Sequence, residues 1–230
     1  MIEDRIAEAA ARAGRDPANV EVVAVTKTVP VERILEAYAA GFRAFGENRV
    51  QERQAKATEL DRAATYPAGE APRWHLVGPL QSNKARRAIE LFDVAQTVDS
   101  LELAQRLDRL AGEIRPDRRY AILLQVNVDA DAAKSGFEPV NLERELPAIL
   151  DLEHLAVGGL MTVGRAVEQA EQARPTFAAL RTLAERLRSR DARLGPTLSM
   201  GMSGDYAVAV EEGATLVRIG SAIFGARPSG

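Results

Sequence analysis

Eight short apolar segments alternate with helix-like segments along this chain from one end to the other. Such an alternation predicts a parallel sheet wrapped by helices, and a count of eight predicts that the sheet closes. We therefore expect an α/β fold, a single TIM-like (β/α)8 barrel over residues 1–230, with no second domain. The expected strands are 22–26, 43–45, 74–77, 94–98, 121–126, 155–160, 197–200 and 216–219.

Amphipathic segments lie between the expected strands, with apolar residues recurring at three- and four-residue steps. They are 31–40, 48–61, 82–91, 100–112, 139–149 and 165–190. A helical segment at 2–13 precedes the first strand and can supply the eighth outer helix, because little beyond 222–230 follows the last strand. Residues 62–73, which hold two prolines and a glycine, predict a loop.

Charge and composition argue against several classes of function. The net charge is −3, and 30 basic and 33 acidic residues are mixed along the chain, so no basic stripe indicates nucleic acid. There is no cysteine, no signal-peptide-like start and no apolar run long enough for a bilayer. The two histidines are far apart and predict no metal site. We expect a cytoplasmic protein whose partners are small molecules or proteins.

Polar residues gather where the expected strands end. In barrels of this kind the active site lies at the carboxyl ends of the strands. We therefore expect one ring of side chains around one mouth. Its expected members are Lys27, Glu47, Asn48, His75, Gly78, Ser100, Asn127, Met161, Thr162, the run from Ser199 to Ser203 and the run from Arg218 to Ser221.

Lys27 is one of only four lysines in a chain that otherwise prefers arginine. It closes the run Val-Val-Ala-Val-Thr-Lys, which predicts a buried strand with the amine at its end. A lysine amine that burial or a nearby cation keeps neutral is nucleophilic and forms imines with aldehydes, which arginine cannot do. The alternative is a lysine that extends into solvent from the strand end.

Two glycine-containing segments lie at the ends of the last two expected strands. Residues 199–205 lie at the end of the seventh strand, and residues 217–225 run through the end of the eighth. Glycine allows close backbone approach, Ser203 and Ser221 offer hydroxyls, and a helix start near Ser203 would direct free amides at an anion. Barrels commonly bind phosphate at this position, so we expect a phosphate cradle. Alternatively, the glycines at 201, 204 and 220 serve only turns and strand ends.

Three further residues allow two interpretations each. Arg218 faces inward or outward, depending on register. If inward, its fixed charge opposes protonation of a ring nitrogen that it contacts, which weakens an electron sink and suits narrow reactivity or none. His75 either lines the pocket or is a hydrogen-bonded structural histidine. Asn48 either lines the pocket or caps a helix.

Several motifs carry a family resemblance together with Lys27. They are Gly-Glu-Asn-Arg-Val-Gln-Glu at 46–52, His-Leu-Val-Gly-Pro-Leu-Gln-Ser-Asn-Lys at 75–84, Leu-Ser-Met-Gly-Met-Ser at 198–203 and Val-Arg-Ile-Gly-Ser-Ala-Ile-Phe-Gly at 217–225. With them the chain resembles the pyridoxal phosphate homeostasis protein family over nearly its whole length. It is also similar to the N-terminal barrel of alanine racemase, the fold-type III arrangement. The resemblance implies that Lys27 carries pyridoxal 5′-phosphate as a Schiff base. It further implies that Ser203, Gly220 and Ser221 hold the phosphate, that Arg218 meets the pyridine nitrogen, and that Asn48, His75 and Met200 line the pocket.

By this resemblance the chain is a carrier and regulator of pyridoxal phosphate in vitamin B6 homeostasis, with no catalytic residue assigned, and we expect it to be a monomer. Its implied partners are small amino acids and apo-enzymes that depend on the cofactor. The chain stops soon after the last strand, where alanine racemase continues into the domain that supplies its second base. The alternatives are a small fold-type III enzyme such as an amino-acid racemase, and an aldolase in which Lys27 attacks a phosphorylated sugar without a cofactor.

Overall fold

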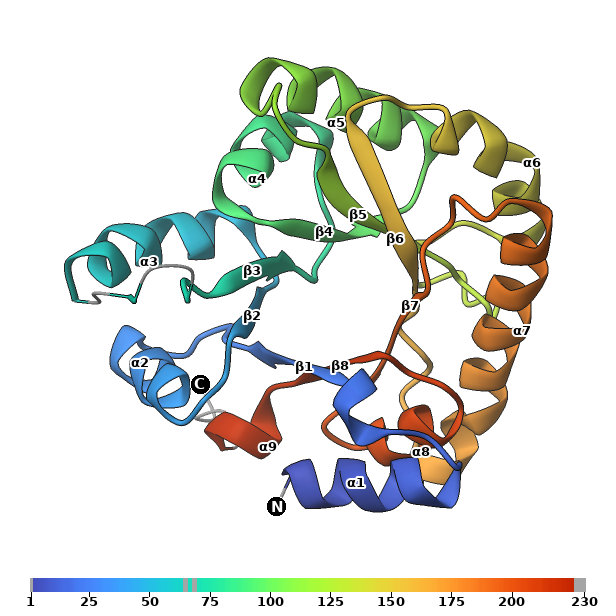
Figure 1. Ribbon diagram of the computed structural model, residues 1–230, viewed down its shortest axis with the longest axis horizontal. Helices are drawn as coiled ribbons and strands as arrows, with labels where there is room; N and C mark the ends of the chain where they lie inside the picture. Colours follow the sequence, from blue (N-terminus) through green and yellow to red (C-terminus); the bar gives the residue numbers. More distant parts are fainter. Residues whose placement is uncertain (1, 64–65, 68–69, 226–230) are drawn as a thin grey trace.

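Eight parallel strands form a closed barrel in this computed structural model, which describes residues 2–63, 66–67 and 70–225. The strands pair in sequence order and β8 returns to β1, as predicted (Figure 1). They are β1 (Glu21–Val25), β2 (Ala44–Glu47), β3 (Arg73–Leu76), β4 (Val94–Val98), β5 (Tyr120–Gln125), β6 (Leu155–Met161), β7 (Thr197–Met202) and β8 (Leu216–Ile219). Every strand bound lies within two residues of its predicted position.

The strands are buried on both faces. Every residue of β2, β4 and β8 is buried, because helices cover the outside of the barrel while side chains fill its interior. This double burial explains why the strands appear in the sequence as continuous apolar runs. The polar residues within them, such as Gln96 and Arg218, therefore lie inside the protein.

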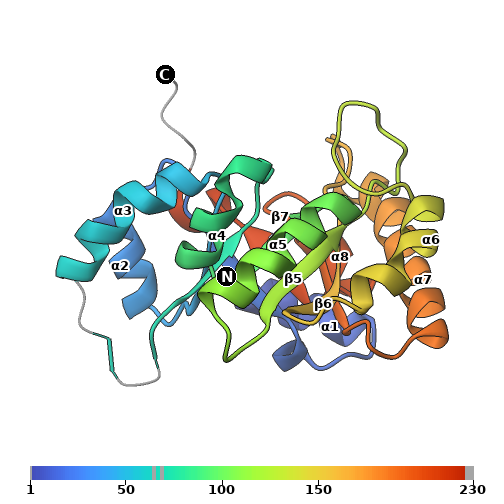
Figure 2. The same ribbon diagram turned by 90° about the horizontal axis from the view of Figure 1, so that it is seen from above.

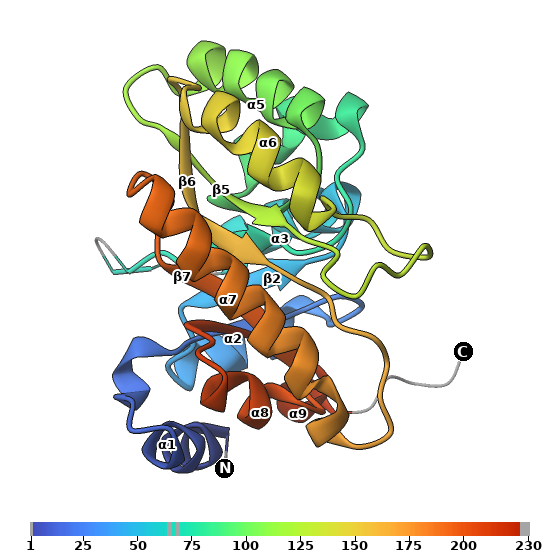
Figure 3. The ribbon, with the colours of Figure 1, turned by 90° about the vertical axis from the view of Figure 1, so that its right-hand side faces the viewer.

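The helices form an outer layer around the strands (Figure 1). They are α1 (Ile2–Arg12), α2 (Val31–Ala39), α3 (Val50–Ala63), α4 (Ala85–Leu91), α5 (Leu101–Ile114), α6 (Pro139–Leu150), α7 (Arg174–Arg190), α8 (Tyr206–Glu211) and α9 (Ser221–Phe224), with short 3-10 turns η1 (Pro17–Asn19), η2 (Ser82–Lys84) and η3 (Ala170–Ala173). The segment between β5 and α6 projects from the barrel in Figures 2 and 3. Within the described ranges, no helix is long and apolar enough to cross a membrane.

Helix α1 packs against α8 in the outer layer, which fits the predicted role of the N-terminal helix (Figure 1). It buries Ile6, Ala9 and Ala10. Just beyond its end, the Arg15 guanidinium donates to the carbonyl oxygens of Val210 and Ala214, at 2.5 and 3.0 Å. Side-chain packing and these hydrogen bonds together fix the N-terminal helix to α8 and to the segment before β8.

The prediction of one helix over 165–190 was wrong in its first part. An irregular segment leads from β6 into η3, and α7 begins only at Arg174. Pro175 explains the difference, because proline lacks an N–H and clashes with the preceding turn inside a helix but fits its first turn. The expected loop at 62–73 is shorter than predicted, since α3 continues to Ala63 and β3 begins at Arg73; residues 64–65 and 68–69 lie outside the described residues.

Candidate functional site

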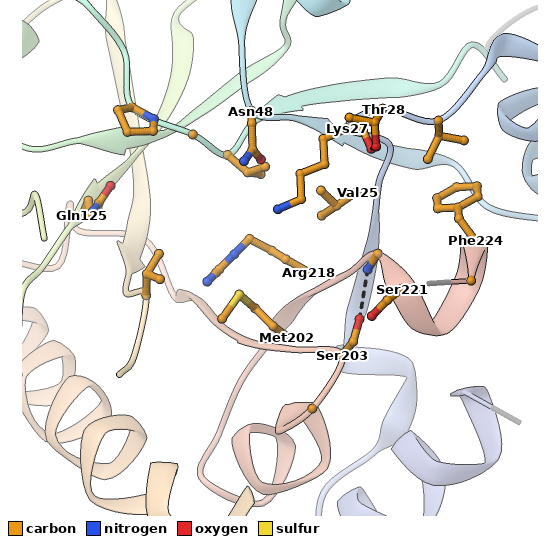
Figure 4. Close-up of a pocket in the computed structure, with 18 of the residues that line it drawn as sticks. Val25, Lys27, Thr28, Asn48, Gln125, Met202, Ser203, Arg218, Ser221 and Phe224 are labelled. Carbon is orange, nitrogen blue, oxygen red and sulfur yellow. Dashed lines mark hydrogen bonds between the residues drawn. The ribbon is translucent and has the colours of Figure 1, made fainter. Parts of the chain in front are cut away.

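A cavity of about 770 Å³ opens at the carboxyl ends of the strands. Six of the eight predicted site residues line it, namely Lys27, Asn48, Ser203, Arg218, Gly220 and Ser221. Figure 4 shows Lys27 and Asn48 entering from one side, with Arg218 and Met202 opposite. The strands therefore bring together residues that are almost 200 positions apart in the sequence.

Lys27 lies two residues beyond the end of β1 and is half-buried. Its side chain extends into the cavity toward Arg218 (Figure 4). Among the residues that the structure describes, none forms a hydrogen bond or ion pair with its amine. Lys27 thus does not extend away into bulk solvent, and its amine is free to react with an aldehyde in the cavity.

Two side chains of α3 hold the backbone on either side of Lys27. Lys56 Nζ donates to the carbonyl oxygen of Thr26 at 2.7 Å, and the Thr28 N–H donates to Glu52 Oε1 at 2.7 Å. Thr28 has a φ of 62°, a conformation that costs a β-branched residue free energy and persists only where its surroundings hold it. The two α3 contacts therefore fix the turn that presents the Lys27 side chain.

Glu47 was predicted at the mouth but lies beneath it, fully buried and outside the cavity wall. Its Oε1 accepts hydrogen bonds from the Thr26 hydroxyl at 2.7 Å and from Lys56 Nζ at 2.6 Å. Burial raises the pKa of the Glu47 carboxyl, and the hydrogen bond from Lys56 opposes that rise. The ion pair is thus a structural support under the Lys27 turn.

The predicted phosphate cradle lies at one end of the cavity. Ser203 Oγ accepts from the Gly220 N–H at 3.2 Å and from the Ala222 N–H at 3.4 Å, as Figure 4 shows for the first contact. The short helix α9 begins at Ser221, so the loops after β7 and β8 and a short extra helix meet here. Barrels of this class commonly bind phosphate with such an arrangement.

Two details of the cradle differ from the prediction. The helix after β7 begins at Tyr206 with Asp205 preceding it, and Asp205 Oδ1 accepts from the Met202 N–H at 2.6 Å. Gly201 has a φ of 91°, and a Cβ there would lie 2.5 Å from Ala209 Cβ. Gly201 therefore serves the turn and the packing of α8, as the alternative interpretation held, and does not line the cavity.

Arg218 faces inward, which settles its register. Its NH1 donates to Ser199 Oγ at 2.6 Å and its NH2 to the carbonyl oxygen of Thr162 at 2.7 Å. Burial lowers the pKa of its guanidinium to about 10, while the negative charge of Asp205 acts in the opposite direction. Arg218 is therefore a fixed, charged donor in the cavity wall at neutral pH.

His75 and Met200, the other two predicted site residues, are buried inside the barrel and outside the cavity wall. His75 Nδ1 lies 2.8 Å from Gln96 Nε2. Burial lowers the pKa of the His75 imidazole to about 3, with the charge of Arg73 as a smaller cause. His75 is thus the hydrogen-bonded histidine of the alternative interpretation, and Met200 belongs to the hydrophobic core.

Other members of the predicted ring have local structural roles. Ser100 caps α5 by accepting from the Leu103 N–H at 3.2 Å. The Asn127 amide donates to the carbonyl oxygen of Asp131 at 2.9 Å and so shapes the segment after β5. In the described part of the chain, no group of three or more His, Cys, Asp or Glu residues could hold a metal ion.

Sequence reasoning missed the contribution of β5 and the segment after it. Gln125, Lys134 and Ser135 line the cavity, and the Gln125 amide donates to the carbonyl oxygen of Ser135 at 2.8 Å. Gln125 and Gln96 are both polar residues within apolar strands, a pattern that indicates a buried polar role. That signal would have pointed to both glutamines.

Comparison with known proteins adds to this geometry. Residues 1–228 match the family described as alanine racemase, N-terminal domain. A relative from Vibrio alginolyticus, named pyridoxal phosphate homeostasis protein, is 44% identical over 217 residues, which are 94% of this chain and 90% of the relative. The chain belongs to the pyridoxal phosphate homeostasis protein family. The family resemblance found in the sequence motifs is thereby confirmed.

Solved structures that are similar to this chain have the same fold. The structure of PipY from Synechococcus elongatus with PLP bound is 42% identical, with a TM-score of 0.83, and the match covers 98% of this chain and 100% of PipY. An alanine racemase from Clostridium difficile is 16% identical, with a TM-score of 0.70, and the match covers 99% of this chain and 60% of that enzyme. The second likeness shows a shared barrel fold and nothing further.

Proposed function

We propose that this chain binds pyridoxal 5′-phosphate as a Schiff base on Lys27 and serves in vitamin B6 homeostasis without catalytic turnover. The observation that carries the proposal is the free Lys27 amine in a cavity that also holds the cradle and Arg218. The cofactor supplies a reactive aldehyde when it is bound. A homologue, PipY, is known with PLP bound, which supports the same ligand here.

The residues of the cavity suit this ligand chemically. Ser203 and Ser221 offer hydroxyl groups to a phosphate, and the N–H of Gly220 holds the Ser203 hydroxyl in place. Arg218 offers a charged donor to the pyridine nitrogen, and Asn48 borders the cavity beside Lys27. The volume of about 770 Å³ lies within the range of small-molecule sites, roughly 300–1,000 Å³.

A carrier role fits this cavity better than racemisation does. Racemisation by two opposed bases needs a second proton acceptor across the ligand from Lys27. Among the described residues of the wall, the other lysine is Lys134. Its Nζ donates to the carbonyl oxygens of Val163 and Gly164 and lies 3.7 Å from Asp131. Its amine is therefore already engaged as a hydrogen-bond donor to the protein, which does not suit a second catalytic base.

The proposed partners, oligomeric state and location of the protein follow from the same proposal. Gln125 borders the cavity on the side away from Ser203 and Ser221 (Figure 4), where we propose that a small amino acid reaches the cofactor. Apo-enzymes that require pyridoxal phosphate are the proposed recipients, and we propose a monomer that acts in the cytoplasm. The carrier role itself does not depend on these assignments.

The test combines a spectrum with a turnover assay. Pyridoxal phosphate added to the purified protein should produce a visible imine band that Lys27→Ala lacks. Sustained conversion of an amino acid that disappears in Lys27→Ala would overturn the carrier role in favour of a fold-type III enzyme. A colourless protein that binds sugar phosphates would favour the aldolase and refute the cofactor assignment.

A further inference from the structure

A row of buried hydrogen bonds crosses the barrel interior beneath the cavity. Arg218 NH1 on β8 donates to Ser199 Oγ on β7 at 2.6 Å, and Ser199 Oγ donates to Gln96 Oε1 on β4 at 2.7 Å. The other end of the Gln96 amide, Nε2, lies 2.8 Å from His75 Nδ1 on β3. All four residues are less than 5% exposed.

The direction of these hydrogen bonds follows from the chemistry of their members. A guanidinium only donates, so Ser199 Oγ accepts from Arg218, and its single proton goes to the Gln96 carbonyl oxygen. The Gln96 NH2 group then faces His75, whose Nδ1 must accept. His75 is therefore neutral, with its proton on Nε2.

The row restricts the Arg218 side chain. Besides Ser199, the guanidinium donates to the Thr162 carbonyl oxygen at 2.7 Å. Thr162 is itself held by a bond from its N–H to the Ser199 carbonyl oxygen at 3.1 Å and by one from its hydroxyl to the Val126 carbonyl oxygen at 2.8 Å. Buried polar groups without partners are costly, so a rotation of the guanidinium that breaks these bonds leaves the buried Ser199 and Thr162 acceptors without it.

We propose that Ser199, Gln96 and His75 are positioning residues, which hold the Arg218 guanidinium so that its remaining N–H groups face a ring nitrogen in the cavity. This inference rests on the proposed function, because the ring nitrogen belongs to pyridoxal phosphate. Correctly aimed, the fixed positive charge of Arg218 keeps that nitrogen unprotonated. The row thus sets the electronic state of the ligand from residues that do not line the cavity.

The first test measures the ¹⁵N chemical shift of the pyridine nitrogen in labelled pyridoxal phosphate bound to the full chain. We expect an unprotonated nitrogen in the wild type and a shift toward the protonated position in Ser199→Ala and in Gln96→Met. Cofactor affinity should fall by roughly two- to tenfold, the effect of one hydrogen bond. Ser199→Ala only removes an oxygen atom, so it keeps the test available if Gln96→Met does not fold.

Tyr120→Phe is the matched control, because Tyr120 is fully buried and its hydroxyl has no hydrogen-bond partner among the described residues. It also removes one buried oxygen but should leave both the nitrogen shift and the affinity unchanged. An unaltered nitrogen shift in Ser199→Ala and Gln96→Met would overturn the proposal, even if both variants lose stability.

A second measurement needs no cofactor. NMR on the cofactor-free protein measures how fast the Arg218 side-chain N–H protons exchange with water. This exchange should be faster in Ser199→Ala than in the wild type and in Tyr120→Phe. Equal exchange rates would contradict the positioning role. If the wild type binds no pyridoxal phosphate, the proposed function fails, whereas this exchange experiment still decides whether the row holds Arg218.

Discussion

His75 should make the protein lose stability in acid, and the size of the loss follows from its burial. The side chain is 1% exposed, and burial lowers the pKa of its imidazole from 6.5 to about 3. Below pH 6.5 the unfolded chain takes up a proton that the folded protein refuses until about pH 3. Falling pH therefore favours unfolding, and these two pKa values imply a loss of about 2 kcal/mol between pH 7 and pH 5.

The perturbation that isolates this effect is His75→Asn, which keeps an acceptor for the Gln96 amide but cannot titrate. The free energies of unfolding of both proteins are measured in urea, without cofactor, at pH 7 and pH 5. Every other titrating group is shared, so it cancels in the difference. Between pH 7 and pH 5, the free energy of unfolding of the wild type should fall by about 2 kcal/mol more than that of the variant. A difference that stays constant with pH would refute the buried, neutral histidine.

Three further substitutions test other parts of the structure. Lys56→Met leaves the buried Glu47 carboxylate unpaired and should cost about 3–5 kcal/mol in urea unfolding, much of which the double variant with Glu47→Gln should restore; an unchanged midpoint would contradict the buried pair. Gly78→Ala places a Cβ 2.3 Å from a backbone oxygen and should cost over about 1 kcal/mol, whereas Gly204→Ala, with open space around it, should stay within about 0.5 kcal/mol. Ser203→Ala should weaken cofactor retention by about 1–2 kcal/mol, and equal affinity in equilibrium dialysis would remove its hydroxyl from the cradle.

The barrel was predictable from the sequence because its signals are local. Each strand is a short apolar run, and doubly buried strands need no alternation that could be misassigned. The start of α7 was less predictable, since the amphipathic pattern continues upstream of Arg174 and only Pro175 marks the true boundary. The four-residue α9 is too short to produce a periodic signal.

The site was only partly predictable, because direction and depth are tertiary properties. Arg218 allowed two registers in the sequence, and strand pairing alone decides that it faces inward. His75 and Met200 lie on strands that reach the cavity, yet their side chains stop beneath it. Lys56 supports the Lys27 turn from another element, a contact that no spacing rule predicts.

The most direct test of the proposed function is to locate the covalent bond. Pyridoxal phosphate is added to the purified protein, the adduct is reduced with borohydride, and peptide mass mapping identifies the modified residue. Our account predicts a single stoichiometric adduct on Lys27. An adduct confined to Lys56, Lys84 or Lys134, or none at all, would contradict it.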